Sequence, residues 1–172
     1  DAYWMIQQAI SSPDPVSFFE PKRRYWQKGP VNLDTAPLPL HSARLLREGT
    51  EVTLIAYGPM VPTALQAAEI AAEEGVSIEV MDLRSISPID YPTLLASAQK
   101  TGRVIIASEA PTNVSVASEI ASRIAEQSFY YLQAPVLRVG GFDTPYPPAK
   151  LEEEYLPDAD RILEAVDRVL AY

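Results

Sequence analysis

The chain has 172 residues, enough for one domain with part of another, and its 47% apolar and 22% charged content is ordinary for a globular protein. Fourteen basic against 23 acidic side chains give a net charge of -9, which argues against nucleic-acid binding, since a phosphate backbone needs clustered Lys and Arg. The lack of cysteine and the single histidine exclude disulfides, thiolate zinc sites and histidine-rich metal sites. No apolar run approaches the roughly 20 residues of a membrane helix.

The first 20 residues form a separate piece. Ala2–Ile10 is predicted to be a helix and Val16–Phe19 a strand. One helix and one strand cannot enclose a core, so we expect residues 1–20 to be the tail of a preceding domain. Residues 21–39, which contain Pro and Gly, are predicted to be a linker, and 40–172 the main domain. The chain begins without a methionine, and we expect it to be part of a longer protein.

Apolar runs predict the sheet. A partly exposed edge strand is expected at Ala43–Arg47, and the short turn at Glu48–Glu51 indicates that it lies antiparallel to the next strand. Four compact runs then start 26, 26 and 32 residues apart: Val52–Tyr57, Ile78–Met81, Val104–Ala107 and Val136–Val139. That spacing suits strand–helix–strand units with buried parallel strands.

The intervening segments have apolar residues at helical spacing. A helix is predicted over Val61–Gly75, and a second starts after Asp90, a capping residue, and ends at Gly102. A third covers 116–124 and the last 162–170. Helices on both faces of a mostly parallel sheet predict an α/β fold, a three-layer α/β/α sandwich.

Several phrases occur in order along the chain. They are FFEPK at 18–22, EVTLIAYG at 51–58, DLRSISPID at 82–90 with KTGRVIIASEAP at 100–111, and GFDTPYP at 141–147. Together they resemble the C-terminal domain of transketolase-like, thiamine-diphosphate-dependent enzymes, and most closely the beta subunit of the 2-oxo acid dehydrogenase decarboxylating component. The resemblance covers almost the whole chain. It implies a five-stranded mixed sheet in the order 1-3-2-4-5, with strand 1 antiparallel.

The resemblance also implies a function. Such enzymes oxidatively decarboxylate a 2-oxo acid of the branched-chain or pyruvate type and transfer the acyl group to lipoyl-lysine. Thiamine diphosphate and magnesium lie between the alpha subunit and the first domain of the beta subunit, whose activating glutamate precedes Asp1. We therefore expect no catalytic or cofactor-binding residue in residues 1–172, and no activity from this fragment alone. Residues 142–147 resemble the branched-chain members of the family slightly more than the others. The expected location is the bacterial cytoplasm, or the mitochondrial matrix if the source is eukaryotic.

Assembly and docking are what the resemblance assigns to this part of the subunit. The expected partners are the alpha subunit, a second beta subunit across a twofold axis, and the basic subunit-binding domain of the acyltransferase core. The candidate contacts for that domain are Gln133, Asp143 and Tyr172. Residues 151–172 have seven acids and two arginines, which is either a docking surface or a solvated helix face. Candidates for the twofold interface are Tyr130, Tyr131, Leu132, Phe142, Tyr146 and Pro147.

A monovalent cation site, of the potassium type, is implied in the loop after the first helix. By position in the family, Ala9, Ser12 and Asp14 match the ligands, mostly through main-chain carbonyls. Ser12 replaces an acid found in relatives, and the alternative is an ordinary Pro-rich turn.

The carboxyl ends of parallel strands are where ligands bind in doubly wound sheets. Gly58-Pro59 and Ser108-Glu109 are expected there, but no GxGxxG pattern is present, and we expect an unused crevice. Asp82 and Glu109 are expected to cap helices or to pair with Arg84 or Arg103.

Two other functions remain open from the sequence. One is the C-terminal domain of a single-chain transketolase-like enzyme, such as a deoxyxylulose-phosphate synthase. The other is a non-catalytic interaction domain. The residues that precede Asp1 in the protein discriminate among the three, because a single-chain enzyme has its diphosphate-binding domain there.

Overall fold

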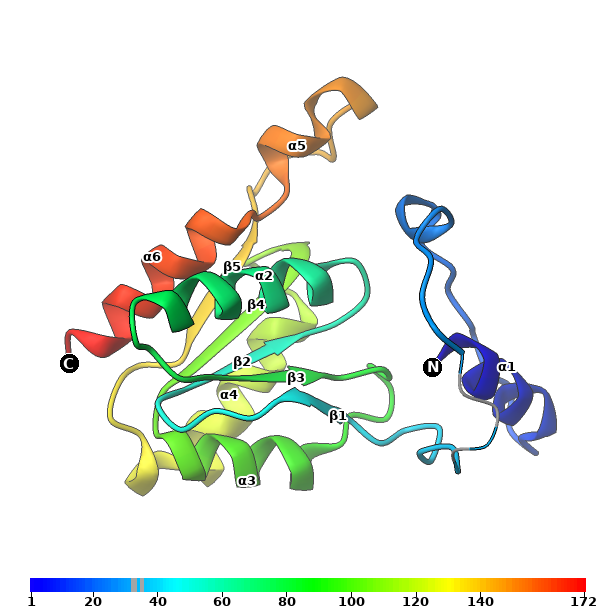
Figure 1. Ribbon diagram of the computed structural model, residues 1–172, viewed down its shortest axis with the longest axis horizontal. Helices are drawn as coiled ribbons and strands as arrows, with labels where there is room; N and C mark the ends of the chain where they lie inside the picture. Colours follow the sequence, from blue (N-terminus) through cyan, green and yellow to red (C-terminus); the bar gives the residue numbers. More distant parts are fainter. Residues whose placement is uncertain (32–33, 35) are drawn as a thin grey trace.

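A single five-stranded sheet organises the chain in the computed structural model, which describes residues 1–31, 34 and 36–172 (Figure 1). Its order is β1-β3-β2-β4-β5, with the last four strands parallel and β1 antiparallel to β3. The strands are β1 (Arg44–Arg47), β2 (Val52–Ala56), β3 (Ile78–Asp82), β4 (Val104–Pro111) and β5 (Leu137–Gly141). The predicted order and directions are confirmed. Of the predicted linker, positions 32, 33 and 35 lie outside the described residues.

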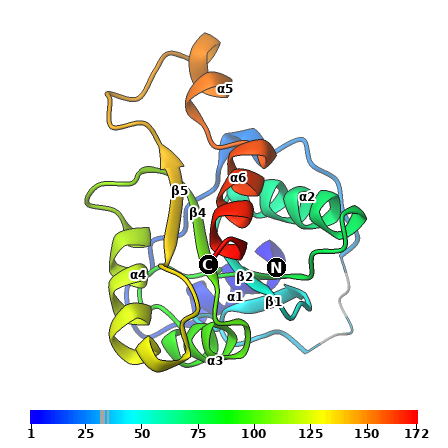
Figure 2. The same ribbon diagram turned by 90° about the vertical axis from the view of Figure 1, so that its left-hand side faces the viewer.

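Helices cover both faces of the sheet, as predicted (Figure 2). On one face lie α2 (Met60–Glu73) and α6 (Ala159–Leu170), and on the other α3 (Tyr91–Thr101) and α4 (Val116–Gln127). Each face has its own apolar cluster. In β2, Leu54 belongs to one and Ile55 to the other, since successive side chains point to opposite faces. A central strand therefore reads as an unbroken apolar run.

Local signals place both ends of α3 correctly. The Asp90 carboxylate accepts the Thr93 N–H at 3.3 Å at the start of α3, and Gly102 ends this helix with φ +69°. Asp90 also accepts the Ala43 N–H at 2.9 Å, which connects the cap to the strand region around β1.

The predicted antiparallel direction of β1 is confirmed, and its hydrogen-bonded neighbour is β3, as the order implied by the resemblance requires. β1 pairs with β3, in the register Arg44 to Asp82, and β3 lies between β1 and β2. The turn after β1 therefore crosses the start of β3. A β-carbon on Gly49 would lie 2.1 Å from the Glu79 nitrogen, so this crossing requires glycine.

The N-terminal segment lies beside the sheet and outside the helical layers (Figure 1). It contains α1 (Ala2–Ser11) and the 3-10 turn η1 (Lys22–Arg24). The strand predicted at Val16–Phe19 is wrong, because a strand needs a neighbour to hydrogen-bond with and this segment pairs with none of the described strands. Asp1 fastens α1 to the sheet through Arg44, 2.9 Å away.

An arm after β5 was not predicted. The turn η3 (Ala149–Leu151) and the short helix α5 (Glu152–Tyr155) project from the body (Figures 1 and 2). A further turn, η2 (Phe129–Tyr131), follows α4. None of the described helices combines the length and apolarity that a membrane crossing requires.

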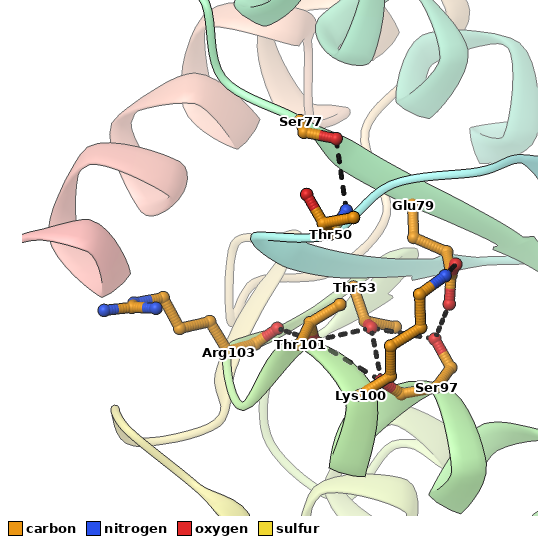
Figure 3. Close-up of polar contacts among 8 residues, drawn as sticks. All are labelled: Thr50, Thr53, Ser77, Glu79, Ser97, Lys100, Thr101 and Arg103. Atoms are coloured by element: carbon orange, nitrogen blue, oxygen red, sulfur yellow. Dashed lines mark hydrogen bonds and ion pairs between the residues drawn. The ribbon is translucent and has the colours of Figure 1, made fainter.

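A buried polar network joins α3 to the amino ends of the strands (Figure 3). The Thr53 hydroxyl lies 2.8 Å from the hydroxyls of both Ser97 and Thr101. Ser97 donates to Glu79, whose other carboxylate oxygen receives Lys100. Because nearly every group in the network has a partner, the buried acid is tolerated there.

Candidate functional site

A groove of about 810 Å³ brings together two of the three predicted docking residues, Gln133 and Tyr172. It lies between α4, the start of β5 and the C-terminus. Apolar residues supply most of its wall: Ala121, Ala125, Phe129, Leu132, Ala134, Pro135 and Val136. Such a surface suits a protein partner that offers an apolar side chain with a charged rim.

The local structure around Gln133 explains how the groove forms. Ser128 is fully buried at the end of α4, and its carbonyl accepts the Tyr131 N–H at 2.8 Å in the η2 turn. The Gln133 N–H then bonds the Gly102 carbonyl at 2.8 Å, which fixes this residue against the end of α3. From the other side, α6 carries Tyr172 to the groove, where it is 74% exposed.

Asp143, the third predicted docking residue, lies elsewhere. Gln133 precedes β5 and Asp143 follows it, so a five-residue strand of about 3.3 Å per residue separates the two. Asp143 accepts a hydrogen bond of 2.6 Å from the Asn113 amide and lines a second groove, of about 460 Å³, beside β5. Val136 and Arg138 line both grooves and connect them.

The residues predicted for a twofold interface fall into two groups. Tyr130, Tyr131 and Leu132 surround the η2 turn, and Tyr130 is 96% exposed. Phe142, Tyr146 and Pro147 belong to the arm. Phe142 and Tyr146 pack edge-on against the buried Tyr155 ring, with centroids 6.3 and 5.2 Å away, and both keep half of their surface exposed. Both groups therefore offer aromatic surface to a partner.

Polar groups cluster at the carboxyl ends of β2 and β4, the position at which the sequence predicted a crevice. A hydrogen bond joins the side chains of Tyr57 and Ser108, and burial raises the pKa of Tyr57. Burial also raises the pKa of Glu109, against the opposing effect of two linker arginines. The partner of Glu109 is Arg23, at 3.7 Å, and not Arg84 or Arg103 as expected.

Asp82 contacts the expected Arg84, but through the main chain, and the Arg84 guanidinium pairs with Asp1. The Asp82 carboxylate accepts the Arg84 N–H at 2.9 Å, and burial raises its pKa despite the nearby guanidinium. Arg103 instead donates to the Val169 carbonyl at 3.0 Å and so joins the start of β4 to α6.

The predicted cation ligands share one turn. The Ser12 N–H bonds the Ala9 carbonyl at 3.3 Å, and the Ser12 hydroxyl accepts the Asp14 N–H at 3.2 Å. The structure thus brings Ala9, Ser12 and Asp14 together. Within the described residues, no group of three or more His, Cys, Asp or Glu side chains is arranged to hold a metal ion.

Sequence reasoning missed Arg23 and Arg24 as members of the polar cluster. They belong to a linker and reach side chains or carbonyls far along the chain. The basic pair directly after the phrase FFEPK was the available signal.

Comparisons with known proteins agree on a family. Residues 41–162 match the profile described as "Transketolase, C-terminal domain". Over its whole length the chain is 66% identical to the pyruvate dehydrogenase E1 component subunit beta of Leifsonia xyli subsp. xyli. The match covers 51% of that relative. It is 48% identical to the 3-methyl-2-oxobutanoate dehydrogenase subunit beta of Mycobacterium tuberculosis. This match covers 99% of the chain and 49% of the relative.

A solved structure supports the same relationship. A split-gene transketolase, described as an inactive beta4 tetramer, superposes on this chain with a TM-score of 0.69 and 33% identity. The superposition covers 82% of this chain and 45% of the transketolase chain. The chain spans about half the length of the curated relatives it matches. The resemblance drawn from the sequence phrases is confirmed by these matches.

Proposed function

This chain belongs to the transketolase C-terminal domain family, and from that premise we propose that it is the assembly and docking part of a 2-oxo acid dehydrogenase beta subunit. The whole enzyme uses thiamine diphosphate to decarboxylate a 2-oxo acid and transfers the acyl group to lipoyl-lysine. The observation that carries the proposal is the 66% identity, over the entire chain, to a protein named as such a subunit.

The choice of substrate stays at the level of 2-oxo acids. One relative is named for pyruvate and another for 3-methyl-2-oxobutanoate, a branched-chain acid. The relative with the higher identity is the pyruvate one, which does not favour the branched-chain reading of residues 142–147. Both relatives are named as beta subunits, which favours a two-chain enzyme over a single-chain transketolase-like one.

The cofactor does not fit the residues present. A diphosphate needs a loop that cradles its phosphates, and the sequence has no GxGxxG pattern; within the described residues no group of three or more acids or histidines is arranged to hold a metal. The polar cluster around Glu109 is covered by the chain's own arginines. We therefore assign no step of the reaction to residues 1–172 and place the cofactor and magnesium in the rest of the enzyme.

A monovalent cation, such as potassium, is proposed for the turn of Ala9, Ser12 and Asp14. Carbonyl, hydroxyl and carboxylate oxygens there suit a hard cation, and the Ala9 carbonyl keeps a second lone pair beyond its bond to Ser12. A shift in melting temperature with potassium chloride but not with an equal concentration of sodium chloride, lost in Asp14→Asn, is the expected result. Equal shifts with both salts would remove the site.

The assembly role rests on the two exposed aromatic groups. Residues near η2 and on the arm present apolar surface that a water-exposed subunit has little reason to keep. We propose that the alpha subunit and a second beta subunit cover this surface. A purely non-catalytic interaction domain has the same surface, so activity of the assembled enzyme distinguishes the two.

The docking role rests on the groove with Gln133 and Tyr172. We propose that the basic subunit-binding domain of the acyltransferase core binds there, with the Asp143 groove as an outlying contact. The acids of residues 151–172 lie along the whole of α5 and α6, whose far ends are well separated (Figure 1). Charge therefore attracts the partner over a broad surface, while the groove supplies the specific contacts.

The activity is tested with the full-length beta subunit and its alpha subunit. The pair should decarboxylate a 2-oxo acid only with added thiamine diphosphate and magnesium. Residues 1–172 alone should neither turn over 2-oxo acids nor bind the cofactor in calorimetry. Micromolar cofactor binding by these residues, or full activity of the beta subunit alone, contradicts the proposal.

Docking is tested with the isolated subunit-binding domain. Deletion of Tyr172 and Gln133→Lys should each weaken binding to the assembled enzyme, and higher salt should weaken it further. Asp143→Asn is the control for charge loss outside the groove and should have a smaller effect. The groove is the wrong site if Asp143→Asn has the largest effect of the three, or if all three leave binding unchanged.

A further inference from the structure

The linker turn η1 lies against the carboxyl edge of the sheet, where a doubly wound fold ordinarily receives a ligand. Figure 1 shows it facing the start of α2 from outside the helical layers. Its contacts come from two consecutive arginines, Arg23 and Arg24. We define residues 21–26 as the linker strap.

Arg24 is the inner anchor of the linker strap. Its guanidinium donates to the Pro59 carbonyl, just before α2, in a partly buried hydrogen bond. Burial lowers the pKa of Arg24, with a smaller contribution from Arg23. Its Nε is buried without a hydrogen-bond partner among the described residues. A charged donor in this position resists removal, because a partly buried hydrogen bond from a charged group is costly to break.

Arg23 is the outer anchor. It lies 3.7 Å from Glu109, and its side chain is half-exposed. The charge of Glu152 on α5 also acts on Glu109 and adds to the rise of its pKa, so a second acid lies in the neighbourhood of the strap. Tyr57 and Ser108 supply hydroxyl groups beneath it.

The strap is separate from the core. Both apolar clusters are built from residues 43 onwards, and polar contacts are the ones that fasten residues 21–26. A segment held in this way opens at a lower free energy than the strands beneath it. The strap can therefore leave the carboxyl ends of the strands while the sheet stays folded.

We propose that the linker strap is a built-in cover: Arg23 and Arg24 bind the Glu109 carboxylate and the Pro59 carbonyl at the carboxyl ends of β4 and β2, and release of the strap uncovers these acceptors without unfolding the α/β domain. In the closed state Arg23 and Arg24 engage these acceptors. In the open state Glu109, Glu152 and the Pro59 carbonyl are acceptors for a cationic group.

Hydrogen exchange of the full-length protein, read by mass spectrometry, tests the cover. The reporters are the amides of Arg24, Tyr25 and Gln27, which bond the carbonyls of Pro21, Lys22 and Arg24. Arg24→Met should raise their exchange, corrected for sequence, on the order of tenfold, as expected for loss of a hydrogen bond to a charged group. The amides of β2 and β4 should not change. Lys22→Met, which removes a charge from the same turn, is the matched control and should have little effect.

The outer anchor is tested by a double-variant cycle. Arg23→Met should raise exchange less than Arg24→Met, about two- to fivefold, because its ion pair is partly exposed. Glu109→Gln should add nothing in the Arg23→Met background. The proposal is overturned if Lys22→Met matches Arg24→Met, if Arg24→Met changes nothing, or if the amides of β2 and β4 exchange faster together with the strap.

Discussion

Gly141 and the ring of Tyr155 are packed so closely that a β-carbon on the glycine would lie 2.5 Å from two ring atoms. This contact joins the end of β5 to α5 and sets the direction of the arm. Arg161 supports it, because its guanidinium bonds the Gly140 carbonyl and stacks over Phe142 at 4.7 Å.

Gly141→Ala should therefore destabilise the fold by about 1–3 kcal/mol, since the ring and the strand must move apart. Urea denaturation measures the change. Gly29→Ala is the control, because a β-carbon there meets no atom within 4 Å, and it should be neutral. Equal stability of the two variants would show that the arm and its Tyr155 ring move away from β5 without loss of stability.

Gly49→Ala should be more harmful than Gly141→Ala. The added carbon would meet the main chain of Ile78 and Glu79 at 2.1 to 2.7 Å, and a strand backbone cannot turn aside as a side chain can. We expect a loss of more than about 3 kcal/mol, or no folded protein at all. A folded variant of normal melting temperature would contradict the crossing of this turn over β3.

Lys100→Met should leave the Glu79 carboxylate buried beside α3 with only Ser97 as a partner. An unpaired buried charge costs several kcal/mol, and here the half-exposed lysine reduces the loss to about 1–3 kcal/mol. Adding Glu79→Gln should recover most of it, because a neutral amide keeps the bond to Ser97. If the double variant is less stable than Lys100→Met, the charge of Glu79 is not the cause.

Glu109 should make stability depend on pH. Burial raises its pKa above the ordinary glutamate value of about 4.3, while Arg23 and Arg24 oppose the shift and Glu152 adds to it. A raised folded pKa means that its contribution is fully present below the unfolded value and is lost as pH rises through the folded one. The difference in unfolding free energy between the wild type and Glu109→Gln should therefore fall as the pH rises through this range. Parallel curves would show that Glu109 is not desolvated.

Much of the fold was predictable because its signals are local. The buried strands are short apolar runs, and the start and end of α3 follow from one capping aspartate and one left-handed glycine, Asp90 and Gly102. The predicted strand at 16–19 failed because composition alone cannot supply a neighbouring strand to pair with. The arm with α5 escaped prediction because Tyr155, which holds it, packs on Gly141 and not on nearby residues.

The sequence by itself determined the five strands of the sheet and the four helices that cover it, and its phrases indicated the family and, through it, the strand order. The tertiary structure alone decided that Gln133 and Tyr172 share a groove without Asp143, and that Glu109 binds a linker arginine. The physical reason is distance along the chain. Periodicity and capping act within a few residues, whereas these relationships depend on which distant surfaces pack together to bury apolar area and satisfy charge.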